Sequence, residues 1–102
     1  MTIKRFEDLE CWQEARKLVN MIYAAVRSNP EFQKDFRLVS QYTAAGISVM
    51  NNIVEGWASQ SNNEFIRFLT YSRRSGAESQ NCSYVALDQE YISQDTFQEI
   101  YA

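Results

Sequence analysis

Apolar residues recur every three or four positions along most of the chain, which is the pattern of one side of an α-helix. The pattern runs through residues 8–27, 35–57 and 61–91, and more briefly through 93–102. Short polar stretches separate these segments. The pattern therefore predicts an all-α fold, an antiparallel up-down-up-down four-helix bundle with a short fourth helix.

Residues that start and stop helices lie at the expected ends. Asp35 and Ser61 are good N-terminal caps, and Glu64 could complete a reciprocal capping box with Ser61. Pro30 ends the first helix because it disfavours a helical residue before it. Gly56 is expected to adopt the left-handed conformation that often follows the last turn of a helix.

Small and polar residues form a second stripe on the helix predicted over 35–57, at spacings of three and four that place them on one side. This stripe would face polar residues of the third helix. Its simplest role is a set of hydrogen bonds that fixes helix register; a ligand or partner groove, or catalysis by Glu55 and Glu78, are the alternatives. The stripe comprises Gln41, Ser48, Asn52 and Glu55, with Ser75 and Glu78 opposite. Gly46, inside the same helix, is expected to permit close approach of another backbone.

Composition limits the class of protein. With 102 residues the chain forms one domain, residues 1–102. A hydrophobic content of 45% with 3 Gly and 1 Pro excludes a disordered chain and disfavours an all-β fold. No apolar run has the length of a membrane span, and the N-terminus lacks the apolar core of a secretory signal. We expect a cytoplasmic protein that does not enter a membrane.

The chain contains no histidine, which excludes histidine-based acid–base and nucleophilic catalysis and the usual zinc sites. Cys11 and Cys82 lie far apart in sequence and are expected to be reduced, half-buried thiols, with a disulfide or a reactive thiol as the alternative. The sequence thus predicts no catalytic residue, no metal and no cofactor. It is not expected to be an enzyme.

Charge and aromatic residues suggest two kinds of surface. The net charge is −3, and four acidic residues gather in 88–102. Arg67, Arg73 and Arg74 could form a basic surface for nucleic acid, or a solvated helix face with ion pairs. A small bundle has little room for so many aromatic rings, so contact with a neighbouring copy is the alternative to packing within the subunit. The candidate interface residues are Phe32, Trp57, Phe97 and Tyr101.

The segment Asn52-Ile53-x-Glu55-Gly56, after the run Gln41-x-x-x-Ala45-x-x-Ser48, carries a family resemblance. The chain resembles the four-helix-bundle proteins encoded in intervening sequences of bacterial 23S ribosomal RNA genes. Further matching residues are Phe6, Leu9, Trp12, Gln13, Ala15, Ile22, Tyr23, Leu38, Glu64, Phe65, Phe68, Leu69, Ser75 and Glu78. The resemblance implies an all-α bundle that assembles into a homopentameric ring and has no known enzymatic activity.

A similar protein, the accessory variability determinant of diversity-generating retroelements, shares the bundle and the pentamer; it is basic and binds nucleic acid and a reverse transcriptase. Our chain differs from the family pattern where Tyr42, Thr43 and Ala44 follow Gln41 and where Arg74 precedes Ser75. Two hypotheses follow. The preferred one is a non-enzymatic homo-oligomeric scaffold with a protein partner, and the alternative is an RNA- or DNA-binding accessory protein.

Overall fold

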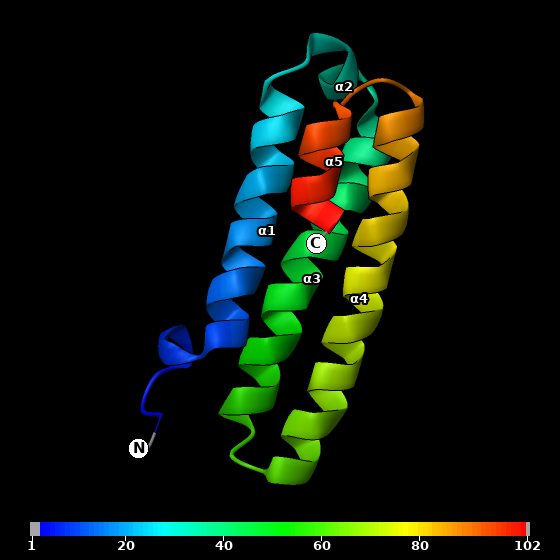
Figure 1. Cartoon of the computed structure of the whole chain (residues 1–102). Helices are drawn as coiled ribbons and strands as arrows, with labels where there is room; N and C mark the ends of the chain where they lie inside the picture. The colour runs from blue at the N-terminus through cyan, green and yellow to red at the C-terminus, as the bar shows by residue number, and fades with distance from the viewer. Residues whose placement is uncertain (1–2, 102) are drawn as a thin grey trace.

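The computed structural model describes residues 3–101, which fold into a bundle of helices (Figure 1). The elements in chain order are η1 (Phe6–Asp8), α1 (Glu10–Arg27), α2 (Pro30–Lys34), α3 (Phe36–Ala58), α4 (Asn62–Asp88) and α5 (Gln94–Tyr101). The predicted all-α bundle with a short last helix is confirmed. The 3₁₀ turn η1 and the short helix α2 were not predicted.

Helices α1, α3 and α4 run along the long axis of a body of 44 × 21 × 19 Å. Helix α3 packs against α4 along most of its length and against α1 on its other side. Helix α5 contacts both α4 and α1, and lies between them in the half of the bundle that also holds α2 (Figure 1). The other half is therefore built from the three long helices alone.

The main apolar core lies at the α2 end. Phe32, Tyr42 and Ile22 are completely buried there. The ring of Phe32 stacks on Tyr91, with centroids 4.9 Å apart, and on Tyr42 at 6.3 Å. Apolar residues of α5, including Phe97, complete this cluster. Helix α2 exists because Asn29 accepts hydrogen bonds from the amides of residues 31 and 32, which carries Phe32 inward.

The predicted N-terminal caps form, one of them incompletely. The Asp35 carboxylate accepts a hydrogen bond from the Leu38 amide at 3.1 Å, and Ser61 accepts one from the Glu64 amide at 3.3 Å. The reciprocal half of the capping box is absent from this end of α4. The Glu64 carboxylate instead lies 2.7 Å from Arg67, so an ion pair one turn along takes the place of that bond.

The C-terminal ends differ from prediction. Gly56 is not left-handed and lies inside α3; Gln60, with φ 56°, is the left-handed residue. Helix α4 ends at Asp88, not Tyr91, because Glu90 has φ 62°. There the Glu90 amide donates to the Leu87 carbonyl, and the Tyr91 amide donates to the Ala86 carbonyl. These two bonds are the pattern of a Schellman motif.

Two glycines let helices approach closely. A Cβ on Gly46 would lie 2.9 Å from Cδ1 of Ile22 in α1, which confirms the packing role expected for this glycine. A Cβ on Gly56 would lie 2.8 Å from Cδ1 of Phe65 and 2.9 Å from Cβ of Phe68 in α4. Both distances are shorter than carbon atoms tolerate. The α1–α3 and α3–α4 spacings therefore depend on the missing side chains.

We predict that Gly56→Ala lowers the free energy of unfolding by about 1–3 kcal/mol, because the gain in helix propensity is smaller than the cost of pushing α4 away. Urea denaturation followed by circular dichroism measures this change. Gly76→Ala is the matched control: a Cβ at Gly76, in α4, meets no atom within 4 Å. That variant should gain up to about 1 kcal/mol. Equal effects of the two substitutions would contradict the packing argument.

Candidate functional site

Part of the predicted polar stripe is a hydrogen-bonded seam between α3 and α4. The hydroxyls of Ser48 and Ser75 lie 2.7 Å apart. The Asn52 amide donates to the Ser48 carbonyl at 2.8 Å and to its hydroxyl at 3.1 Å. The Ser48–Ser75 bond crosses between the two helices, whereas both Asn52 bonds stay within α3. A bond across the contact favours one register of α3 against α4.

Serines that were not among the predicted site residues extend this seam. Ser72 donates to the Val49 carbonyl at 3.0 Å, and Ser83 donates to the Ser79 carbonyl at 3.0 Å while it also bonds the Tyr42 hydroxyl. All three serines are buried. Serines repeated at helical spacing on the inward side of α4 are the sequence signal that could have identified them.

The outer members of the stripe lie elsewhere. Gln41 and Glu78 are exposed and line a hollow of about 320 Å³ on the outer side of α3 and α4, together with Asn81 and Cys82. Glu55 is exposed at a different level of the bundle, since its neighbour Gly56 contacts Phe65 and Phe68. At ~1.5 Å per residue, Glu55 and Glu78 are separated by roughly 15 Å along the axis. The structure does not bring these two carboxylates into one site.

Both cysteines are free thiols in differing surroundings. Cys11 is exposed, whereas Cys82 is buried. Burial, and to a smaller degree the charge of Glu78, raises the pKa of the Cys82 thiol above its ordinary value. Burial and the raised pKa both lower the fraction of reactive thiolate at this position. Within residues 3–101, no three acidic or thiol side chains are grouped as a metal site.

The structure separates the three candidate arginines. Arg67 and Arg74 flank the exposed ring of Tyr71, with guanidinium carbons 5.9 and 5.8 Å from its centroid. Arg73 lies on another side of α4, where it lines a groove toward α1. Of the three arginines, Arg67 forms an ion pair with Glu64, and no other ion pair among the described residues involves one of the three. Tyr71, which sequence reasoning missed, is the centre of this Arg–Tyr–Arg surface.

The candidate interface residues divide into two groups. Phe32 is completely buried and Phe97 is 5% exposed, so both pack within the subunit and cannot reach a neighbouring copy. Trp57 is half-buried and lies edge-on to Phe6, and Tyr101 is 37% exposed. The ring of Tyr84, also exposed, lies 5.7 Å from that of Tyr101.

The two large apolar side chains with the highest exposed fractions were not among the predicted interface residues. Phe36, at the start of α3, is 79% exposed, and Ile66, in the first turns of α4, is 63% exposed. Because α3 and α4 are antiparallel, these two residues lie toward opposite ends of the bundle (Figure 1).

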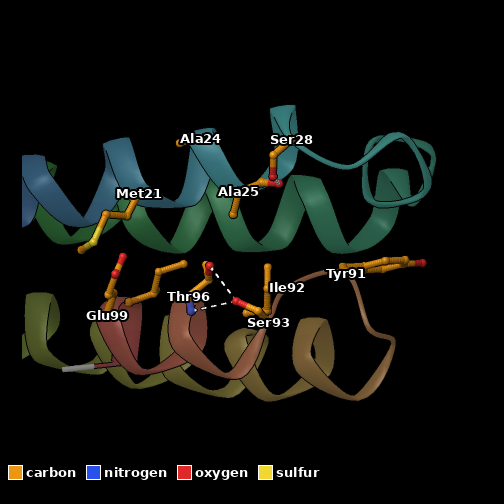
Figure 2. A pocket seen from close by; sticks show the side chains of 10 residues that line it. Met21, Ala24, Ala25, Ser28, Tyr91, Ile92, Ser93, Thr96 and Glu99 are labelled. Carbon is orange, nitrogen blue, oxygen red and sulfur yellow. Dashed lines mark hydrogen bonds between the residues drawn. The ribbon is translucent and has the colours of Figure 1, made fainter.

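A hollow of about 440 Å³ lies beside α5, between this helix and α1 (Figure 2). Ser93, which directly precedes α5, lies at the edge of this hollow. Its hydroxyl accepts a hydrogen bond from the Thr96 amide, at 3.1 Å, and so caps the helix. The remaining lining is mostly apolar and small, with Glu99 as its charged residue. This hollow offers shape but no set of converging polar groups.

A larger groove of about 710 Å³ separates α1 from α4 beyond the C-terminal end of α5. We call it the α1–α4 groove. Its lining is Cys11, Glu14, Ala15, Leu18, Met21, Val49, Ile53, Leu69, Ser72, Arg73, Gly76, Ala77, Ser79, Gln80, Glu99, Ile100 and Tyr101. The floor is apolar and the charged residues come from α1, α4 and α5.

A family model described as "23S rRNA-intervening sequence protein" matches residues 7–102, which is nearly the whole chain. The search of curated proteins finds no match. In the described part of the chain, each helix is too short or too polar to cross a membrane. The resemblance carried by Asn52, Ile53, Glu55 and Gly56 is therefore confirmed at the level of the family.

The buried Tyr42 hydroxyl generates a prediction about pH. Burial raises the pKa of Tyr42 from its ordinary value of 10 to about 12, although the hydrogen bond with Ser83 works against this shift. Because the pKa of Tyr42 is higher in the folded state, the contribution of its neutral hydroxyl to stability is complete below pH 10. This contribution is lost as the pH rises toward 12. A stabilisation on the order of 2–3 kcal/mol should disappear across this window.

Ultraviolet absorbance of tyrosinate, recorded together with circular dichroism, tests this prediction. The titration should show a late component that is missing in Tyr42→Phe. Tyr23→Phe, which removes an exposed tyrosine, is the control and should keep the late component. A late component that is intact in Tyr42→Phe would contradict the assignment.

Proposed function

Because this chain belongs to the family of 23S rRNA-intervening sequence proteins, we propose that it is a non-enzymatic scaffold that assembles into a homopentamer. The observation that carries the proposal is the exposure of Phe36 and Ile66, at 79% and 63%. Large apolar side chains in water are a cost that contact with another copy removes. The family resemblance implies that five copies take part.

The position of these residues suits a ring. In a closed ring each copy meets its two neighbours through two different surfaces. Phe36 and Ile66 lie on different helices and toward opposite ends, so they belong to separate patches that such a contact could join. The half-buried Trp57 and the exposed Tyr101 are further candidates for these patches.

The arrangement of polar residues supports a non-enzymatic role. The Ser48 hydroxyl bonds Ser75 across the α3–α4 contact, and the Asn52 amide bonds Ser48 within α3. Glu55 and Glu78 lie on different levels, so neither can assist the other in acid–base chemistry. The surfaces of the bundle are thus better suited to binding other macromolecules than to converting a small substrate.

Native mass measurement tests the assembly. We expect a species of about five times the 11.9 kDa of one chain. Phe36→Ser and Ile66→Ser should each shift the population toward monomers, because the apolar contact is lost. Arg37→Ser, at the exposed neighbouring position, is the matched control and should leave the mass unchanged. A wild-type mass equal to one chain would overturn the proposal.

A second candidate function is nucleic-acid binding by the Arg67–Tyr71–Arg74 surface. An exposed aromatic ring between two guanidinium groups could stack a base while the arginines contact phosphates. Arg74 lies outside the ion pairs of the described residues, so its charge is not already neutralised. A ring of copies would repeat this modest charge several times, which increases avidity.

Fluorescence anisotropy with a labelled structured RNA tests this candidate at about 50 and 200 mM salt. Binding should weaken steeply with salt and should be reduced at least about tenfold by Arg67→Glu with Arg74→Glu. Arg16→Glu with Lys17→Glu on α1 changes the net charge equally and should have a smaller effect. If both double variants weaken binding equally, the named surface is not the site.

A further inference from the structure

Tyr91 lies in the short connection between α4 and α5, and its side chain contacts a different part of the bundle. Its ring stacks on that of Phe32 in α2, with centroids 4.9 Å apart and planes 13° from parallel. The ring points away from α5, toward the end of the bundle that holds α2 (Figure 2). The Schellman motif fixes its backbone, because the Tyr91 amide donates to the Ala86 carbonyl at 2.9 Å. The connection to α5 therefore includes a contact with α2.

Two hydrogen bonds join Tyr91 to the residues that begin α2 and α3. The Asn29 amide group donates to the Tyr91 carbonyl at 3.1 Å, and the Tyr91 hydroxyl donates to the Asp35 carboxylate at 3.0 Å. Asn29 is the N-terminal cap of α2, and the other oxygen of the Asp35 carboxylate caps α3. These caps lie 62 and 56 positions before Tyr91 in the sequence. One residue thus bonds the caps of two helices.

Neither α2 nor α5 is long enough to be stable on its own. Helix α2 has 5 residues and α5 has 8, whereas an isolated helix of fewer than about 12–15 residues is marginal in water. Each is held by the side chains that it buries, which are Phe32 from α2 and Phe97 and Ile100 from α5. All three belong to one apolar cluster, against which Tyr91 also packs. The two short helices therefore depend on the same core.

We propose that Tyr91 couples the docking of α5 to the docking of α2, so that the two short helices open and close as one unit. When α5 leaves the bundle, residues 89–93 move with it and the Tyr91 ring leaves Phe32. Asn29 and Asp35 then lose their bonds to Tyr91, and α2 loses the ring that holds it. The α2 end of the bundle thus has a closed and an open arrangement, in place of two helices that fray separately.

The open arrangement uncovers the aromatic core in one step. Phe32 and Tyr42 are completely buried in the closed arrangement, and their rings stack on each other at 6.3 Å. Phe97 of α5 belongs to the same cluster. Because both short helices leave together, a contiguous apolar surface forms at once, whereas fraying of one helix end would expose only part of it.

Native-state hydrogen exchange on the full chain measures the coupling. The reporters are the Phe97 amide in α5 and the Gln33 amide in α2, both of which donate to backbone carbonyls. Ile100→Val directly weakens only the docking of α5, because it removes one buried methyl group at the end of α5 away from α2 (Figure 1). It should accelerate exchange of both reporters by the same factor, about two- to tenfold.

Ile53→Val is the matched control. It removes the same methyl group from a residue of α3 that is 2% exposed. Ile53 lies roughly 25 Å along the axis from the start of α3, in the half of the bundle away from α2. It takes no part in the proposed unit, so this variant should leave both reporters at their wild-type exchange rates.

The same measurements in the Tyr91→Ala background test the role of Tyr91. There Ile100→Val should accelerate exchange of Phe97 and leave Gln33 unchanged. Acceleration of Phe97 alone in the wild-type background would overturn the proposal, because the helices would then open separately. Equal acceleration of both reporters in the Tyr91→Ala background would also overturn it, because the coupling would then bypass Tyr91.

Tyr91→Phe replaces Tyr91→Ala if the latter does not fold. This variant keeps the ring that stacks on Phe32 and loses the bond to Asp35. In this background Ile100→Val should accelerate exchange of Gln33 by a smaller factor than exchange of Phe97. If the two factors are equal there, the proposal is wrong.

Discussion

The close contact between α3 and α4 determines the spacing of the whole bundle. Gly56 brings the backbone of α3 against Phe65 and Phe68, where any side chain at that position would meet the ring of Phe65 and the Cβ of Phe68. Further along, Ser48 meets Ser75, and the Tyr42 hydroxyl meets Ser83. Small residues set the distance and hydroxyls set the register, so the two helices have one well-defined way to pack. Helix α1 and helix α5 then pack on this pair.

The main helices were predictable because their apolar residues recur with helical spacing over several turns. Asp35 and Ser93, which are good N-terminal caps, also mark where two of the helices begin. Helix α2 was not, because five residues with Phe32 as their one large apolar side chain show no period. The end of α4 was also missed: Glu90 takes a left-handed conformation that usually belongs to glycine or asparagine. Gly56 was assigned the wrong role, since a helix end and a close contact both require the absence of a side chain.

The candidate site was predictable only in its centre. Ser48, Asn52 and Ser75 do meet, as helical spacing indicated, whereas Gln41, Glu55 and Glu78 lie at the outer edges of the same stripe. A spacing rule identifies a side of a helix but not how much of that side the neighbour covers. Arg73 shows the same limit. Consecutive residues point about 100° apart on a helix, so Arg73 lines the groove toward α1 while Arg74 contacts Tyr71.

The uneven core has a consequence for dynamics. Its large buried cluster, including Phe32, Tyr42 and Phe97, lies at the α2 end, while the opposite half is closed by fewer buried side chains, among them Ala15 and Ile53. Local opening requires less free energy where fewer apolar contacts are lost. Amide hydrogens in the first turns of α1 should therefore exchange faster than those near Ile22. The half of the bundle away from α2 is therefore the half that can adjust its shape at the lowest cost in free energy.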